Sequence, residues 1–284
     1  MNKEDIRGLA ADFVRDSKLN VVDGDIALRP DIAGMRLFEE PLVRCAAASD
    51  PFFGELLRPE VIGSHFRLPG DWLSGAQTVV SLFFPFTDVI LRSNRPDLEW
   101  PSQEWLHGRI EGQKLILALC ARLVEALSLE GYAAVTPAAH PDFWKCSRRR
   151  RREEEGGGGP GFTSNWSERH VAHVAGLGTF GLSAGLITEK GMAGRFGSVV
   201  TTLKVEPDPR PYARFDEYCS YCGACIPRCT FGAISLEGRK DHVICGEISA
   251  RNKKKFHPRY GCGKCQVRVP CERGIPKKRI VGKQ

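Results

Sequence analysis

The chain of 284 residues has no long hydrophobic run and no apolar segment near its amino terminus. Its longest apolar stretches, such as 79–86, are far shorter than the ~20 residues that a membrane-spanning helix needs. The first residues, Met-Asn-Lys-Glu-Asp, lack the apolar core of a secretory signal. We therefore expect a cytoplasmic protein without membrane contact, and its 42% hydrophobic content is sufficient for a buried core.

The eleven cysteines are unevenly spaced, and eight of them fall between Cys219 and Cys271. In a reducing compartment, clustered cysteines indicate metal or redox ligands rather than disulfides. Cys120 lies in an apolar helical stripe and is predicted to be a small core residue. Cys45 and Cys146 have no partner at ligand spacing, so we assign them no function.

The first cysteine run, C-x2-C-x2-C-x3-C, has the spacing of a bacterial ferredoxin and comprises Cys219, Cys222, Cys225 and Cys229. Three thiolates at this spacing wrap around one [4Fe–4S] cubane, and the fourth ligates the other cluster in two-cluster ferredoxins. Thr230 stands where a proline usually follows the fourth cysteine. Gly223 and Ala224 keep the loop small, so backbone N–H groups can approach the cluster sulfurs.

The second set is looser and contains Cys245, Cys262, Cys265 and Cys271. The crossing rule of two-cluster ferredoxins predicts that the first cluster is held by Cys219, Cys222, Cys225 and Cys271. It assigns the second cluster to Cys262, Cys265, Cys229 and Cys245. Structural zinc bound by the two C-x2-C pairs is the alternative, but zinc does not require a triplet of cysteines. The chain is therefore predicted to move electrons through two [4Fe–4S] clusters.

Positive charge is concentrated at the carboxyl end, in a chain whose formal net charge is +7. Residues 251–284 contain twelve Lys or Arg and one acid, Glu272. Such a segment suits a polyanion such as RNA, or it is simply a solvated basic tail. The stretch 147–161 is rich in Arg, Glu and Gly and cannot contribute to a core, so we interpret it as a mobile loop or an arm that contacts RNA.

Hydrophobic patterning predicts strands that alternate with helices in the first 205 residues. We expect helices over 3–18 and from the N-cap Ser102 to Leu129, and strands over 76–86, 132–136 and 197–205. Three prolines between 207 and 211 mark a linker. The prediction is an α+β or α/β layer domain over 1–205, followed by a two-cluster ferredoxin-like domain over 206–284.

The segment Gly176-Leu-Gly178-Thr-Phe-Gly181 matches G-x-G-x-x-G, the fingerprint of dinucleotide binding. That fingerprint needs a preceding strand, a following helix and an acidic residue ~20 positions further on. Residues 168–175 have a helical pattern instead, and the residue 20 positions beyond Gly181 is Thr201. We therefore reject NAD binding and expect the glycines to allow close backbone approach, to another element or to a flat cofactor.

Two features together resemble the epoxyqueuosine reductase family, which is related to the reductive dehalogenases. The segment from Glu168-Arg169 through Gly181 is similar to the one that precedes the ferredoxin domain of these enzymes. The order of the eight cysteines is also similar: a C-x2-C-x2-C-x3-C run, a lone Cys245, the Cys262/Cys265 pair and a final Cys271. The resemblance extends over roughly residues 70–275.

This resemblance implies a nitroreductase-like amino-terminal domain, a cobalamin cofactor and two [4Fe–4S] clusters. The family removes the epoxide oxygen from epoxyqueuosine in tRNA, and a low-potential cluster can reduce cobalamin for attack on an electrophilic carbon. Gly176, Gly178, Gly181, Arg195 and Ser198 would border the corrin. We expect a reduced ferredoxin or flavodoxin as electron donor, and tRNA as a partner of the basic carboxyl-terminal segment.

The chain departs from the family at the position of its proton donor, an Asp a few residues upstream of the Glu-Arg pair. Residues 161–167, Gly-Phe-Thr-Ser-Asn-Trp-Ser, contain no carboxylate, and Asp142 is the nearest upstream acid outside the 147–161 stretch. The catalytic residues therefore stay unassigned. Two alternatives remain open at this point: an electron carrier with a partner-binding amino-terminal domain, or a flavin-linked reductase.

Overall fold

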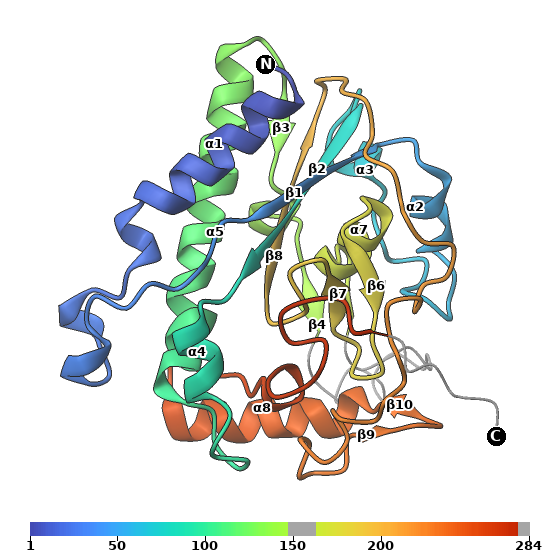
Figure 1. Ribbon diagram of the computed structural model, residues 1–284. Helices are drawn as coiled ribbons and strands as arrows, with labels where there is room; N and C mark the ends of the chain where they lie inside the picture. Colours follow the sequence, from blue (N-terminus) through green and yellow to red (C-terminus); the bar gives the residue numbers. More distant parts are fainter. Residues whose placement is uncertain (147–162, 278–284) are drawn as a thin grey trace.

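The computed structural model describes residues 1–146 and 163–277, and the predicted loop at 147–161 lies outside this range. Its centre is a four-stranded sheet in the order β1–β2–β8–β3, and every neighbouring pair is antiparallel. Mixed helices and an antiparallel sheet make the fold α+β (Figure 1). The strands of this sheet are β1 (Leu42–Ala47), β2 (Thr78–Pro85), β3 (Ala134–Val135) and β8 (Gly194–Thr201).

The central strand β2 is buried along its whole length, which explains its continuous run of β-branched and aromatic residues. The predicted strand over 76–86 is thus confirmed, including its end at Pro85. The predicted strand over 197–205 was placed too late, because β8 pairs with β2 from Gly194 opposite Pro85 to Thr201 opposite Thr78. The strand expected over 132–136 is reduced to the two residues of β3.

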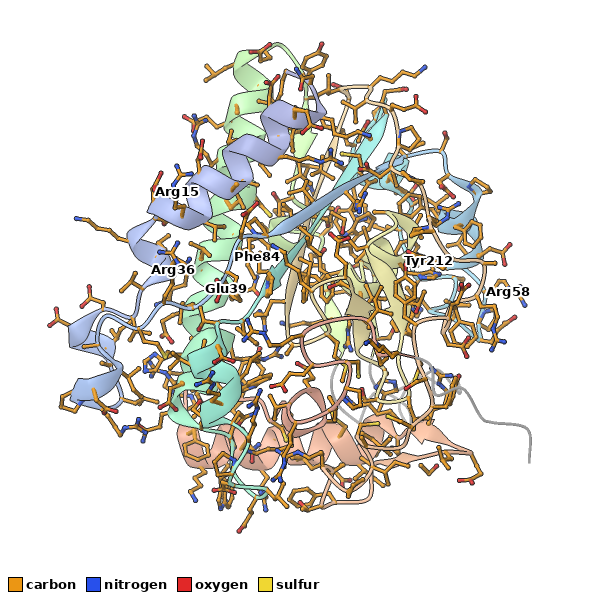
Figure 2. All side chains as sticks on the ribbon, in the orientation of Figure 1. Arg15, Arg36, Glu39, Arg58, Phe84 and Tyr212 are labelled. Atoms are coloured by element: carbon orange, nitrogen blue, oxygen red, sulfur yellow. The ribbon has the colours of Figure 1, made fainter. Side chains whose placement is uncertain are left out.

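Helices α1 (Lys3–Asp16) and α5 (Gln103–Leu129) cover one face of the sheet (Figure 1). Both were predicted, and the Ser102 side chain caps α5 by accepting a hydrogen bond from the Trp105 N–H at 3.1 Å. Phe84 of β2 lies between the sheet and α5 (Figure 2), where its ring is 5.6 Å from that of Phe38. Cys120 is buried in the same core, as predicted.

The other face of the sheet packs against α7 (Glu168–Val174) and, next to it, α2 (Pro51–Glu55) and α3 (Pro69–Trp72). The hairpin of β6 (Gly178–Phe180) and β7 (Leu186–Thr188) follows α7. The G-x-G-x-x-G segment therefore follows a helix and enters a strand, the reverse of the dinucleotide fingerprint. The remaining elements of this part are α4 (Asp88–Ser93), β4 (Lys145–Cys146) and β5 (Thr163–Ser164).

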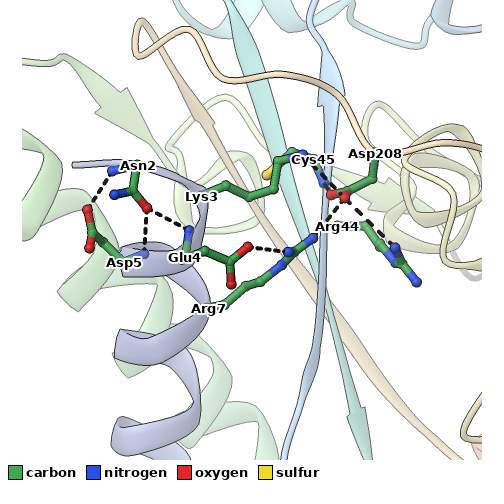
Figure 3. A network of polar contacts seen from close by, with 8 residues as sticks. All are labelled: Asn2, Lys3, Glu4, Asp5, Arg7, Arg44, Cys45 and Asp208. Carbon is green, nitrogen blue, oxygen red and sulfur yellow. Dashed lines mark hydrogen bonds and ion pairs between the residues drawn. The ribbon is translucent and has the colours of Figure 1, made fainter.

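The proline-containing segment after β8 is fixed to the amino-terminal half through Asp208. The Asp208 carboxylate accepts a hydrogen bond from the Cys45 N–H at 2.8 Å and pairs with Arg7 at 2.7 Å and Lys3 at 3.3 Å (Figure 3). Further along, Tyr212 stacks on His173 of α7 with ring centres 5.0 Å apart (Figure 2). The segment thus runs along the domain surface as part of the fold.

The residues from 213 onward form the cysteine-rich part of the molecule, with β9 (Ile234–Ser235), β10 (Arg239–Lys240) and α8 (His242–Phe256). Buried polar contacts hold it to α4 and its following loop. The Lys264 ammonium donates to the Asn94 backbone and side-chain oxygens at 3.0 and 2.9 Å, and Asn94 donates to the Cys262 carbonyl at 3.0 Å. Arg95 forms a salt bridge with Glu272 at 3.0 Å. The division into domains at 205/206 stays a prediction.

Candidate functional site

One cavity is lined by the thiols of Cys219, Cys222, Cys225 and Cys271. The first three come from the loop before β9, and Cys271 enters from the far end of the chain, where its carbonyl accepts from the Met192 N–H at 3.0 Å. Burial raises the pKa of Cys225 and of Cys271 to about 12, and the neighbouring thiols add to the shift. Four thiols that repel one another when ionised form a donor set that a cationic metal core stabilises.

The second group consists of Cys245 in the first turn of α8, Cys262, Cys265 and Cys229. Cys265 interacts electrostatically with both Cys245 and Cys229, and Cys262 interacts with Cys245 and Cys265. Burial raises the pKa of Cys262 to about 11, and Lys240 hydrogen-bonds Cys245. Cys265 also interacts with Cys225 of the first group, so the two groups are neighbours, and their assignment as ligands of separate clusters stays a prediction.

No three His, Cys, Asp or Glu side chains within residues 1–146 and 163–277 are arranged to hold a single metal ion. A cubane makes a different demand, because each of its four thiolates binds a separate iron atom.

Beside the second group lies a set of arginines that comes from three elements: Arg109 of α5, Arg169 of α7 and Arg195 of β8. Burial lowers the pKa of both Arg169 and Arg195, and repulsion from neighbouring arginines lowers it further. The pKa of Arg195 falls to about 9. Arg169 also interacts with Cys245 and Cys265. Among the described residues, none of these arginines forms a salt bridge with a carboxylate. They present uncompensated positive charge next to the cysteines.

The Arg109 guanidinium lies over the ring of Tyr260, 4.8 Å from its centre. Burial alone would raise the Tyr260 pKa, but Arg109, Lys145 and Arg195 outweigh it and lower that pKa. The Nε atoms of Arg109 and Arg195 are buried without a hydrogen-bond partner among the described residues. Because a polar ligand would satisfy these free donors, we treat Arg109 of α5 and Arg195 of β8 as a candidate ligand site. The sequence alone did not indicate it, because Arg109 belongs to no motif.

The burial and the pKa of the Glu168 carboxylate were also not predicted. Its carboxylate oxygens are buried, and Trp166 donates through Nε1 to the neighbouring Ser198 hydroxyl at 2.9 Å. Neither oxygen has a hydrogen-bond partner among the described residues, and burial raises the Glu168 pKa to about 7, a shift that the nearby Ser198 and Trp166 only partly offset. From the sequence, Glu168 was identified only as part of the family segment, because its burial depends on the packing of α7 against the sheet.

We expect the Glu168→Gln variant to gain stability relative to the wild type as the pH rises. The folded-state pKa, about 7, lies above the ordinary 4.5, so ionisation penalises only the folded protein. The penalty is absent below pH 4.5, grows up to about pH 7 and persists above it, reaching about 3 kcal/mol. Urea unfolding at pH 5 and pH 8 measures it. The substitution Glu125→Gln, at an exposed glutamate, serves as control. If the unfolding free energies of Glu168→Gln and the wild type differed by the same amount at both pH values, the prediction would be contradicted.

The five residues predicted to border the corrin have different neighbours in the structure, and that role stays a prediction. A Cβ on Gly176 would lie 2.7 Å from the Pro209 carbonyl, and one on Gly178 would lie 2.0 Å from the Ile187 carbonyl. Both glycines therefore allow close approach between protein elements. Gly181 lines the first cysteine cavity, whereas Ser198 accepts from Trp166 and Arg195 faces Gln113 of α5.

Residues 163–167, which contain no carboxylate, include an asparagine with a structural role. Asn165 is buried, accepts from the Trp144 N–H at 3.0 Å and donates to the Asp142 carbonyl at 2.9 Å. The Asp142 carboxylate is exposed, and its pairing with Arg67 at 2.9 Å lowers its pKa. Asp142 is thus held ionised at the surface, which makes it unsuited to donate a proton in the ligand site.

The chain is similar to a curated epoxyqueuosine reductase of Listeria monocytogenes serovar 1/2a, with which it is 32% identical over 122 residues. The match covers 39% of this chain and 31% of that protein, so the chain spans about a third of the relative's length. The resemblance to the epoxyqueuosine reductase family is confirmed. No protein-family model matches the chain.

Solved structures show the same fold. An epoxyqueuosine reductase in complex with an epoxyqueuosine-modified tRNA-Tyr stem loop superposes with a TM-score of 0.50 at 16% identity, covering 96% of this chain and 67% of that one. A reductive dehalogenase, described as a B12-dependent enzyme, gives a TM-score of 0.53 at 15% identity over 83% of this chain and 30% of the other. The chain therefore shares its mixed helix and sheet architecture with both groups.

Proposed function

We propose that the chain is an iron–sulfur oxidoreductase that passes low-potential electrons through two [4Fe–4S] clusters to a cobalamin-type cofactor. The observation that carries the proposal is the grouping of eight cysteines into two sets of four, one lining a single cavity and the other beside Arg169. Electrons would pass from the first set to the second and then to the space between α5 and β8. The similarity to epoxyqueuosine reductase supports this reading.

The residues of the ligand site fit a large polar cofactor. The free Nε donors of Arg109 and Arg195 suit the amide carbonyls around a corrin ring. Of the five residues predicted to border the corrin, Arg195 is the one with such a free donor. When bound, a cobalamin supplies a reducible cobalt centre able to attack an electrophilic carbon. Around it, the arginines would bind and orient anionic or carbonyl groups, while Gly176, Gly178, Gly181 and Ser198 remain proposed wall positions.

We further propose tRNA as a partner of the basic carboxyl-terminal segment, a role supported by the epoxyqueuosine reductase solved with a tRNA stem loop. Lys253, Lys254 and Lys255 are exposed in the last turn of α8. Lys255 and Arg251 both lie over the Trp100 ring, 3.6 and 3.8 Å from its centre. With cations over that ring, contact with phosphates is favoured over stacking of a base. Residues 278–284 of the segment lie outside the described range.

Anaerobic reconstitution with iron, sulfide and cob(II)alamin tests the proposed function. We expect the reconstituted chain to retain about eight iron atoms and to co-elute with the corrinoid. Iron binding without corrinoid, even at a large excess of cob(II)alamin, would leave the electron-carrier alternative. Retained flavin would instead favour the flavin-linked reductase.

No helix among the described residues combines the length and the apolar character that crossing a membrane requires.

A further inference from the structure

The two groups of cysteines differ in their access to the surface. Cys222, in the first group, is the exposed thiol of the eight, and the others are buried or partly buried. The second group lies against Arg169 and Lys240, on the side of the ligand site. If both groups hold clusters, as the proposed function states, the first is the one that an external electron donor can reach.

Aromatic side chains surround the exposed thiol. Tyr221 precedes Cys222 and is 39% exposed, and the nearby Phe215 is 55% exposed. The Arg239 guanidinium joins them, since it lies 5.2 Å from the centre of the Phe215 ring and 5.8 Å from that of Tyr221. Exposed aromatic rings beside an arginine are typical of interface cores rather than of ordinary protein surface.

The Tyr221 ring is held in a fixed position. Its backbone has φ 51°, in the left-handed region that non-glycine residues rarely adopt. The Tyr221 hydroxyl donates to the Asp216 carboxylate and accepts from Arg239 at 2.7 Å, and Arg214 pairs with the same carboxylate at 3.1 Å. A surface held rigid in this way loses little conformational entropy when a partner binds.

Exposure of the charged groups decides the sign of this surface. The Arg214 side chain is 73% exposed and that of Arg239 31%, whereas the Asp216 side chain is only 5% exposed. The guanidinium groups therefore face the solvent while their carboxylate faces inward. An acidic protein with an apolar patch around its own redox centre complements such a surface.

We propose that Phe215, Tyr221, Arg214 and Arg239 form the docking surface for a small acidic one-electron carrier protein that reduces the cluster at Cys222. The inference rests on the proposed function. One electron leaves the reduced carrier and enters the cluster, whose core changes from [4Fe–4S]2+ to [4Fe–4S]1+, and no covalent bond forms or breaks. The carrier is of the ferredoxin or flavodoxin class, which shares acidity and one-electron chemistry.

Stopped-flow reduction of the reconstituted protein tests the docking surface. The probes are a reduced [2Fe–2S] ferredoxin, flavodoxin hydroquinone and, as a small reductant, dithionite. We expect Phe215→Ser and Arg214→Glu to lower the second-order rate with at least one carrier protein by about tenfold or more. Both variants should bleach with dithionite at the wild-type rate, which shows that their clusters are intact. Calorimetric binding of the oxidised carrier should weaken in parallel.

Lys18→Glu in the amino-terminal half is the matched control, because it reverses an exposed charge outside both basic surfaces. Its rates with both carriers should stay within about twofold of the wild type. Wild-type rates for Phe215→Ser and Arg214→Glu would overturn the docking surface, as would a slow Lys18→Glu variant. A chain that binds no iron would instead refute the proposed function, so the two failures are distinguishable.

Discussion

Replacing Cys271 with Ser should remove one cluster and leave the other, so that about half of the bound iron is lost. The reason is the long-range closure of the first cavity, in which Cys271 lies with Cys219, Cys222 and Cys225, although the sequence places it after the Cys262/Cys265 pair. Iron analysis and low-temperature EPR of the reduced protein measure the loss. The remaining signal should be that of a single, non-interacting cluster.

The matched control is Cys120→Ser, since this thiol is buried in the core of the amino-terminal half, away from both groups. It should keep the full iron content. Loss of both clusters in Cys271→Ser together with normal folding would contradict the two-set arrangement. The arrangement would also be contradicted if the cluster that survives in Cys271→Ser depended on Cys219. A Cys219→Ser/Cys271→Ser double variant tests this, because it would then lose the remaining iron.

The loop that carries the first three cysteines could be predicted because its information is local. Spacings of three residues bring Cys219, Cys222 and Cys225 to one loop whatever the rest of the chain does. The long helix α5 and the strand β2 were equally accessible, since a capping serine and an unbroken apolar run determine them. The limits of β8 were not, because its first residues are fixed by pairing with β2 rather than by their own propensity.

The polar part of the site could not be predicted from local pattern. Arg109, Arg169 and Arg195 are far apart in sequence and meet only because α5, α7 and β8 pack around one space. Glu168 acquires its raised pKa from burial alone, and the docking surface at Tyr221 depends on an ion-pair network with Asp216 and Arg239. Such properties follow from tertiary packing, which spacing and composition do not encode directly.

Contact between the turn before β8 and the final cysteine gives the second large expected effect. Gly191 has φ +80°, and a Cβ there would lie 2.2 Å from the Glu272 carbonyl and 2.5 Å from the Arg273 backbone. Gly191→Ala therefore has to displace the segment that carries Cys271, whose carbonyl accepts from Met192. We expect a loss of about 3 kcal/mol or more in unfolding free energy, measured by urea titration, together with preferential loss of the first cluster.

Gly131→Ala separates the clash from the backbone strain. Gly131 has φ +85°, close to that of Gly191, but a Cβ there meets nothing within 4 Å. Its substitution should cost only the left-handed strain of about 1 kcal/mol and leave the iron content unchanged. Equal costs for the two variants would mean that the Cys271 segment yields freely. A larger cost for Gly191→Ala, with iron lost from the Cys219 group alone, would show that the turn before β8 fixes the fourth ligand of the first cluster.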